Sequence, residues 1–237
     1  MPRFFVDTPL AAPGEIALPP GAARHVQVLR LQPGDALTLF DGSGPEWQAE
    51  VTAMGRSEVR VNLIAAEQPQ RELARAVSLA VVMPANDRMD FLIEKATELG
   101  AAMLQPLVSE RSVLRLAGER ADKKRAHWQG VAIAAAEQSG RTVPMRVEPA
   151  MPLATWLSAL PAPSADEWRG LLSPRAAQPL QAFGQRRALF LSGPEGGLSD
   201  AEEDAARSRG FAPVTLGPRI LRADTAPLAV LSWLALG

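Results

Sequence analysis

The sequence contains no cysteine and no tyrosine, and its only histidines are His25 and His127, which lie far apart in the chain. The lack of cysteine excludes disulfides, thiolate catalysis and cysteine-ligated zinc, and two distant histidines do not form a histidine-based metal site. We therefore expect no metal. No stretch approaches the roughly 18 uninterrupted apolar residues of a membrane span, and the start of the chain lacks the apolar region of a signal peptide. We expect a cytoplasmic protein with no membrane partner.

The net charge of the chain excludes few classes of function. Its formal net charge is −1, so the whole molecule offers no electrostatic argument for nucleic acid binding. The 237 residues, of which 47% are hydrophobic, supply enough material for one large domain or two ordinary ones.

The first part of the chain has a β pattern. Short apolar segments broken by turn residues extend from Phe4 to about Gln70, and they include Ala36–Phe40, Trp47–Ala53 and Val59–Ile64. This pattern predicts a small β-barrel. A polar, proline-containing stretch at 67–72 has the composition of a linker. We therefore predict two domains, residues 1–70 and residues 71–237.

Strand-like and helix-like segments alternate beyond this linker, which predicts an α/β domain with a mostly parallel sheet. Ser199 and Glu202 have the spacing of a capping box, so a helix should start directly after the preceding glycine-rich segment. The final helix is apolar nearly all round, which suits either a subunit interface or a deep core position. The expected strands include Val77–Met83, Met103–Val108, Met145–Val147, Ala188–Leu191 and Val214–Leu216, and the expected helices are Arg88–Leu99, Ala121–Gln138, Asp200–Arg209 and Ala226–Leu236.

Two glycine-rich loops are the strongest candidates for a site. They are Leu191–Ser199 and Leu216–Arg222, and each follows a predicted strand. Open α/β sheets bind ligands at the carboxyl ends of their strands, so both loops should lie at such an edge. Neither has the Gly-Lys-Ser/Thr ending of a phosphate loop or the spacing of a dinucleotide fingerprint. The ligand is therefore of another kind.

Four further clusters lie at the ends of predicted elements, where site residues collect. Each also has a purely structural interpretation. The charges of 94–100 can be solvated, 137–141 can be a helix end with Gly140 after the last turn, and Asp224 or Thr225 can cap the last helix. The four clusters are 94–100, 109–113, 137–141 and 219–226.

Together and in this order, these segments resemble the bacterial small-subunit ribosomal RNA uracil-N3 methyltransferases of the SPOUT class. The resemblance covers nearly the whole chain and departs from the family pattern at Ala85 and at Ala223-Asp224. The matching blocks are 2–6, 25–31 with Gly34-Asp35, 40–42, 87–90, 94–100, Pro106 with 109–113, 127–129, 136–141 with Val143-Pro144, 193–198 and 216–222.

This resemblance implies a PUA-like N-terminal β-barrel that helps to hold RNA and a C-terminal SPOUT-type α/β domain with a deep trefoil knot. It implies S-adenosylmethionine as methyl donor, a homodimer with the site near its interface, and 16S rRNA in the small ribosomal subunit as substrate, methylated at N3 of uracil 1498. The alternatives are a SPOUT enzyme that modifies a ribose 2′-oxygen or a tRNA base, and a non-catalytic RNA-binding protein that has kept the fold.

The site residues follow from the loops and the resemblance together. A sulfonium nucleoside needs no phosphate cradle, because main-chain groups in tight glycine turns can contact its adenine edge while apolar residues enclose the ring. The expected cofactor-binding residues are Leu172, Ser173, Leu191, Ser192, Gly193, Pro194, Glu195, Gly196, Gly197, Leu216, Gly217, Ile220 and Leu221.

Methylation of uracil N3 requires loss of the imide proton, and arginine can stabilise the negative charge that results. We predict Arg222 in this catalytic role. The sequence offers no obvious general base, so the proton is expected to pass to water. The expected RNA-binding residues are Arg3, Arg24, His25, Arg30, Arg111 and Arg141.

Overall fold

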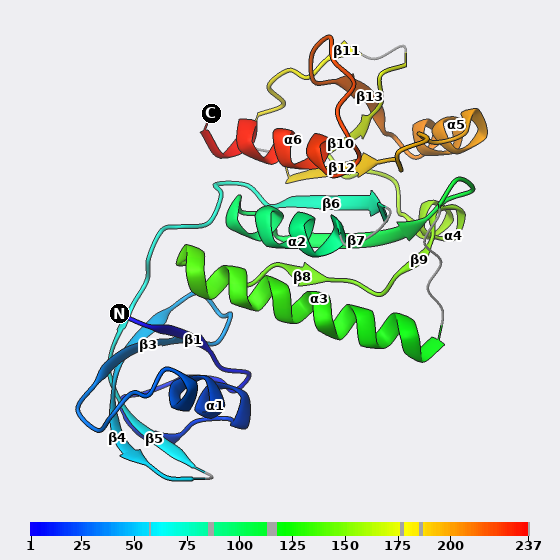
Figure 1. The fold of residues 1–237 in the computed structure, drawn as a ribbon. Helices are drawn as coiled ribbons and strands as arrows, with labels where there is room; N and C mark the ends of the chain where they lie inside the picture. Colours follow the sequence, from blue (N-terminus) through cyan, green and yellow to red (C-terminus); the bar gives the residue numbers. More distant parts are fainter. Residues whose placement is uncertain (57, 85–87, 113–117, 176–177, 185–186, 237) are drawn as a thin grey trace. The chain divides into compact units, whose positions relative to one another are not determined.

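The computed structural model describes residues 1–237 except 57, 85–87, 113–117, 176–177, 185–186 and 237 (Figure 1). Asp87 and Val113, which carried part of the resemblance, and Ala85, where the chain departs from it, lie outside the described residues. The chain divides into two compact units. The first consists of Met1–Glu72 with Ala136–Pro144, and the second of Leu73–Ala135 with Met145–Gly237.

The first unit is a five-stranded sheet in the order β1-β3-β4-β5-β2, with a short helix, α1 (Pro20–Val28). Its strands are β1 (Arg3–Phe5), β2 (Gly14–Ala17), β3 (Ala36–Phe40), β4 (Glu46–Met54) and β5 (Val59–Glu67). The three predicted strands are confirmed, whereas α1, β1 and β2 were not predicted. Residues of β4 alternate between buried and exposed, as in Trp47, Gln48 and Ala49, because successive side chains point to opposite faces.

The residues Ala136–Pro144 belong to the first unit because they bond to its strands. The carboxylate of Glu137 accepts a hydrogen bond of 2.9 Å from the Phe5 N–H. The carbonyl of Gly140 accepts from the guanidinium groups of Arg3 (3.1 Å) and Arg71 (2.7 Å). Gly140 has a φ of +86°, the left-handed conformation that glycine adopts after a helix. The barrel side chains thereby satisfy a carbonyl at the end of α3 (Gly118–Ser139).

The second unit is an α/β fold whose sheet has the order β11-β13-β10-β12-β6-β7-β8, with β9 paired to β7. All of these pairings are parallel, which confirms the predicted mostly parallel sheet. The strands are β6 (Val77–Val82), β7 (Met103–Val108), β8 (Arg146–Val147), β9 (Met151–Pro152), β10 (Glu167–Leu172), β11 (Gln178–Pro179), β12 (Arg187–Ser192) and β13 (Ala212–Thr215).

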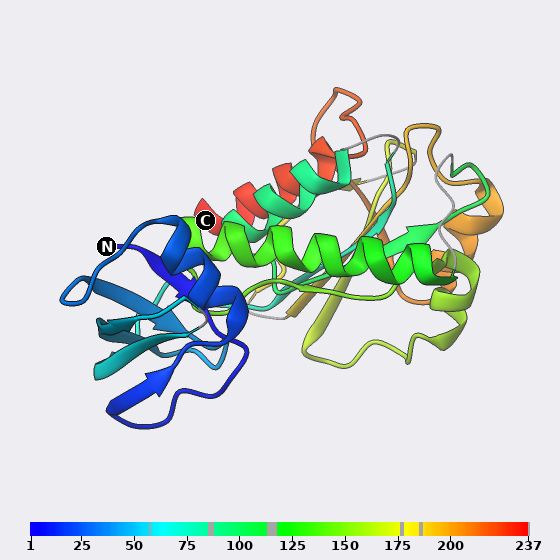
Figure 2. The same ribbon diagram turned by 60° about the horizontal axis from the view of Figure 1, so that its bottom comes forward.

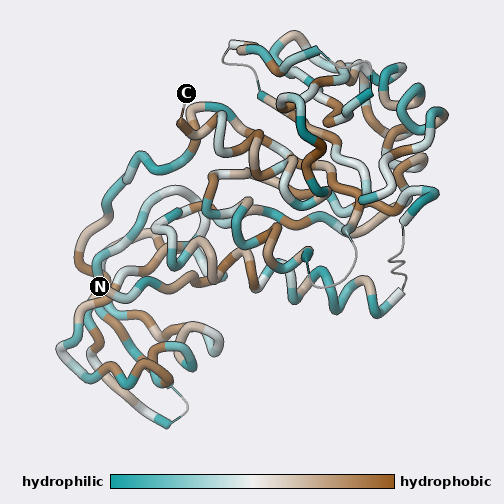
Figure 3. The backbone as a smooth tube through the Cα atoms, turned by 45° about the horizontal axis from the view of Figure 1, so that its top comes forward, coloured by the Kyte–Doolittle hydropathy of each residue, from teal (hydrophilic) through white to brown (hydrophobic). Residues whose placement is uncertain are grey.

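Helices cover both faces of this sheet. On β6, Leu79 and Val81 pack into the core beneath α2 (Arg88–Glu98), α3 and α6 (Thr225–Leu236), while Ala80 and Val82 pack into the core beneath α4 (Leu153–Ala159) and α5 (Asp200–Ser208). Because both faces are covered, the strands are mainly hydrophobic (Figure 3). Helices α2 and α6 lie side by side (Figure 2).

Helix α6 is buried on one side and exposed on the other. Pro227, Val230 and Leu231 are buried, and the two aliphatic residues of this set belong to the core that α6 shares with α2. Trp233 and Leu236 are instead 43% and 91% exposed. One face of the helix therefore completes the core, and the other presents large apolar side chains on the surface. Among the described residues, no helix is long and apolar enough to cross a membrane.

Candidate functional site

Three loops that follow β10, β12 and β13 line one open cavity of about 380 Å³ and a smaller hollow that adjoins it. The three strands are neighbours in the sheet, and their carboxyl ends lie at the same edge because they are parallel. This is the edge where open α/β sheets bind ligands. The two glycine-rich loops predicted from the sequence are thus brought together, and the loop after β10 joins them.

Most of the predicted cofactor-binding residues line this space. Two do not. Leu191 is fully buried within β12, where it packs in the core beneath α4 and α5, and Gly217 forms the turn after β13 without lining the cavity. The lining residues that were predicted are Leu172, Ser173, Ser192, Gly193, Pro194, Glu195, Gly196, Gly197, Leu216, Ile220 and Leu221.

The first glycine loop is a tight turn. The Gly197 N–H donates to the Pro194 carbonyl at 2.8 Å, and Gly197 has a φ of +68°. A Cβ at Gly193 would lie only 3.1 Å from Cγ of Leu198 and 3.2 Å from its backbone nitrogen. The close approach of the two ends of the loop therefore requires glycine at 193, and it leaves main-chain groups exposed to the cavity.

Helix α5 begins directly after this loop, as predicted. The Ser199 hydroxyl accepts from the Glu202 N–H at 3.3 Å, and the Glu202 carboxylate accepts from the Ser199 N–H at 2.9 Å, which completes a capping box. The next residue, Glu203, is 6% exposed and lines the cavity. Its carboxylate accepts a 2.9 Å hydrogen bond from the hydroxyl of Ser173, which lies in the loop after β10.

Glu203 was not predicted as a site residue. In the sequence it is one of several acidic residues in the first turn of a helix, a position explained by the helix dipole alone. Only the contact with Ser173, thirty residues earlier, identifies it. Pro174, Arg175, Leu198, Ala223 and Ala226 also line the cavity without having been predicted.

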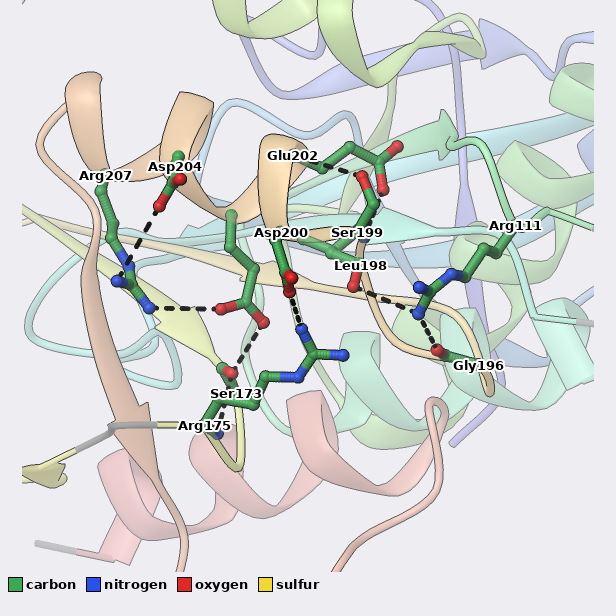
Figure 4. A network of polar contacts seen from close by, with 11 residues as sticks. Arg111, Ser173, Arg175, Gly196, Leu198, Ser199, Asp200, Glu202, Asp204 and Arg207 are labelled. Atoms are coloured by element: carbon green, nitrogen blue, oxygen red, sulfur yellow. Dashed lines mark hydrogen bonds and ion pairs between the residues drawn. The ribbon is translucent and has the colours of Figure 1, made fainter.

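Arg111, which was predicted to contact RNA, also contacts the first glycine loop. Its Nη1 donates to the carbonyl of Gly196 at 2.8 Å and contacts the carbonyl of Leu198 at 3.4 Å (Figure 4). Both carbonyls belong to the first glycine loop. Arg111 therefore holds the loop in place in this structure, and its contact with RNA stays a prediction.

The predicted catalytic residue, Arg222, is exposed and lines the cavity beyond the second glycine loop. Among the residues that the structure describes, its guanidinium has no recorded hydrogen bond or ion pair. On the first loop, Glu195 lies 3.7 Å from Arg88, the first residue of α2. The cavity lining therefore includes an exposed arginine, and Glu195 lies beside a cation.

The RNA-binding predictions in the first unit divide into two groups. Arg24, His25 and Arg30 are exposed on and just after α1. Arg3 and Arg141 are not available to RNA in the same way. Arg141 has a side chain only 4% exposed, with its Nε 3.0 Å from the Glu72 carboxylate, and Arg3 forms an ion pair with Glu46. Both arginines are ion-paired in this structure, and their contact with RNA stays a prediction.

His127 lies apart from the cavity residues. Its Nε2 is 2.6 Å from Oδ2 of Asp90, and Oδ1 of the same carboxylate accepts from the Trp128 indole N–H at 3.0 Å. This contact joins α2 to α3. No group of three or more potential metal-ligating side chains occurs within the described ranges.

The cavity suits a sulfonium nucleoside. Its lining combines apolar side chains such as Leu172, Leu198 and Leu221 with main-chain groups of the glycine loop and a buried carboxylate. No lysine lines it among the described residues. A cation and an adenine ring fit such a lining better than a phosphate chain does, and the volume matches that of small-molecule sites.

Family models match both parts of the chain. An RNA methyltransferase domain matches residues 71–235, and an RNA methyltransferase PUA domain matches residues 18–64. Among relatives, the ribosomal RNA small subunit methyltransferase E of Bacillus subtilis is 33% identical over 87% of this chain and 84% of its own length. The Synechocystis protein of the same name is 34% identical over 87% of this chain and 67% of its own length.

Solved structures agree with the matches to RNA methyltransferases. The crystal structure of a ribosomal RNA small subunit methyltransferase E from Neisseria gonorrhoeae, bound to S-adenosyl methionine, has 36% identity and a TM-score of 0.91, covering 99% of this chain and 96% of that one. A putative methyltransferase from Legionella pneumophila, in complex with the same cofactor, has 29% identity and a TM-score of 0.90 over 99% and 96% of the two chains. The PUA-like first domain and the SPOUT-like α/β domain that follows it are thereby confirmed.

Proposed function

The chain belongs to the ribosomal RNA small subunit methyltransferase E family, and from this membership we propose that it methylates N3 of uracil 1498 in 16S rRNA. The enzyme is an RNA methyltransferase with S-adenosylmethionine as its cofactor. The observation that carries the proposal is the convergence of the three strand-end loops on one cavity, with the exposed Arg222 in its lining.

The bound cofactor supplies the methyl group as an electrophilic sulfonium. The residues of this chain hold it and prepare the acceptor. We assign the cofactor to the loop residues that line the cavity: Leu172, Ser173, Ser192–Gly197, Leu216, Ile220 and Leu221. Main-chain N–H and C=O groups of the glycine turn would hold the adenine edge, and the leucines would enclose its ring.

Arg222 acts on the uracil. When N3 loses its proton, negative charge spreads onto the two flanking carbonyl oxygens, and a guanidinium with free donors can bind them in the plane of the base. Since Arg222 has no recorded partner among the described residues, its donors are available for this contact. The proton passes to water. Because the target base must leave any stack to meet the methyl group, we expect base flipping.

Exposed basic residues of the first domain hold the RNA backbone. Arg24, His25 and Arg30 lie together on the surface of α1 and the turn that follows it. Arg24→Ala and Arg30→Ala should each weaken binding of small subunits and lower the salt slope by about one. Arg60→Ala is the matched control, because Arg60 is a similarly exposed cation of the same domain already paired with Glu15.

A homodimer is the second part of the proposal. Phe91 on α2 and Trp233 and Leu236 on α6 are 51%, 43% and 91% exposed, and Ile220 in the second glycine loop is 86% exposed. Large apolar side chains gathered on neighbouring helices mark an interface. Light scattering should show a dimer, and Trp233→Glu should shift it to a monomer. A monomeric wild-type protein would contradict this part.

The test of the activity is methylation of purified small subunits and of naked 16S rRNA, followed by mass mapping of the modified nucleotide. We expect one methyl group on uracil 1498, at N3. A methyl group on a ribose 2′-oxygen, on another base or on tRNA would replace the proposed position with another. Arg222→Ala should lower the single-turnover rate at saturating cofactor and RNA.

The substrate also leads us to propose that the protein works in the cytoplasm.

A further inference from the structure

Arg111 occupies an unusual position, since one end of its guanidinium is bound to the cofactor loop while the other end is free. Nη1 donates to the carbonyls of Gly196 and Leu198. Within the described part of the chain, Nε and Nη2 have no hydrogen bond or ion pair, and the side chain as a whole is exposed. A guanidinium carries five N–H donors, so most of its capacity is unused.

The segment that carries Arg111 is itself firmly attached to the same loop. Residues 109–112 form a turn after β7, in which the Ser112 hydroxyl accepts from the Ser109 N–H at 2.8 Å. The Glu110 N–H donates to Oε1 of Glu202 at 2.9 Å, and Oε2 of Glu202 accepts from Ser199. The turn is therefore tied to both the glycine loop and the start of α5, and Figure 4 shows Arg111, Gly196 and Glu202 in this network.

We propose that Arg111 is a positioning residue that couples cofactor binding to RNA binding, with Nη1 holding the glycine loop and the Nε–Nη2 edge receiving an RNA phosphate. This edge presents two parallel N–H donors, the geometry that matches a phosphate. The inference rests on the assignment of the cofactor to this cavity and of rRNA as substrate.

The physical basis of the coupling is side-chain entropy. An exposed arginine that holds two carbonyls gives up rotamer freedom, which costs up to about 2 kcal/mol. A phosphate on the free edge restricts the same torsions, so the cost is met once for both ligands. Each ligand should then strengthen the binding of the other by the same factor, as linkage requires.

The experiment measures binding of radiolabelled S-adenosylhomocysteine by equilibrium dialysis, with and without saturating small subunits. This ligand has no methyl group to transfer, so no turnover occurs. For the wild-type enzyme we expect small subunits to tighten binding about five- to tenfold, and the ligand to tighten small-subunit binding in filter assays by the same factor.

Three variants test the assignment. Arg111→Ala should weaken S-adenosylhomocysteine binding about tenfold and bring the coupling factor to about one. Arg111→Lys keeps the charge but has no fork, so RNA affinity should largely recover while the coupling should not. Arg187→Ala is the control, because Arg187 is an exposed, ion-paired arginine at the opposite end of β12 from the loop.

An unchanged coupling factor in Arg111→Ala, a coupling factor of one in the wild type, or full coupling in Arg111→Lys would each overturn the inference. The proposed function fails in a different way, through absence of S-adenosylhomocysteine binding or of rRNA methylation by the wild-type enzyme. The two failures are therefore distinguishable.

Discussion

The Ser173 hydroxyl donates a 2.9 Å hydrogen bond to the Glu203 carboxylate, and both side chains are buried beside the cavity. This bond joins the loop after β10 to the first turn of α5. The same hydroxyl accepts from the Arg175 N–H at 3.1 Å, and Glu203 also contacts Arg207 at 3.3 Å. The loop after β10, which completes the cavity, is thus held by one small polar network.

Ser173→Ala should lower the free energy of unfolding by about 1–3 kcal/mol, because Oε1 of the buried Glu203 carboxylate loses its donor while Oε2 keeps Arg207. Cofactor affinity should fall as the loop loosens. Urea denaturation measures the loss of stability, and titration calorimetry measures the loss of cofactor affinity. Ser158→Ala is the control, since Ser158 is an exposed serine on α4. Equal stability of the two variants would show that the bond does not hold the loop.

The two glycines Gly193 and Gly196 should respond differently to alanine. A Cβ at 193 meets Leu198 at 3.1 and 3.2 Å, whereas the nearest atom to a Cβ at 196 is Cδ of Arg111 at 3.7 Å, an ordinary contact. Gly193→Ala should therefore cost about 1–3 kcal/mol in overpacking. Gly196→Ala should cost much less in unfolding experiments. A larger loss of stability in Gly196→Ala than in Gly193→Ala would contradict the loop geometry.

Glu202 serves two donors from different segments, the Ser199 N–H and the Glu110 N–H. Glu202→Ala should lower stability by about 1–2 kcal/mol, because the capping box is lost and Glu110 loses its acceptor. Asp204→Ala removes an exposed acidic residue from the same helix and should have little effect. Thermal unfolding compares the two. A loss of stability as large in Asp204→Ala would mean that the charge of the helix, and not its cap, accounts for the effect of Glu202→Ala.

Glu137 should make stability depend on pH. Burial raises the pKa of its carboxyl above the ordinary value of 4.5, although the Phe5 N–H and the charges of His25 and Arg3 oppose the shift. The folded state then binds more protons than the unfolded state between the ordinary and the raised pKa. Stability therefore falls as pH rises through this window and is greatest below it.

Glu137→Gln should remove this dependence, because the amide oxygen can still accept from Phe5 without carrying a charge. The measurement is the difference in free energy of unfolding between wild type and variant as a function of pH. We expect the variant to gain relative stability as the pH rises through the window. A difference in free energy of unfolding that stays constant with pH would show that burial does not perturb the pKa of this carboxyl.

The sequence predicted those features that depend on local patterns. Apolar periodicity located β3 and β7 at their observed bounds and α2 to within one residue, and residue type alone identified the capping box of Ser199 and Glu202. The glycine loops were recognisable because the chain repeats the order of strand, glycine-rich turn and helix.

Contacts between distant residues could not be predicted. Glu203 meets Ser173 and Arg111 meets Gly196 only in the folded sheet, and the assignment of Ala136–Pro144 to the first unit depends on bonds to Phe5 and Arg3. Arg141 illustrates the limit most clearly. An arginine after a helix end suits RNA or a structural pair equally well, and its burial beside Glu72 is visible only in the folded structure.

The most direct test is a crystal structure of this enzyme with S-adenosylmethionine. The account predicts the nucleoside in the cavity between the loops after β10, β12 and β13, with its polar edge bonded to main-chain groups of 193–197 and 216–221 and its methyl group toward Arg222. Cofactor density outside this cavity, or bonded mainly to charged side chains while these loops stay unoccupied, would contradict it.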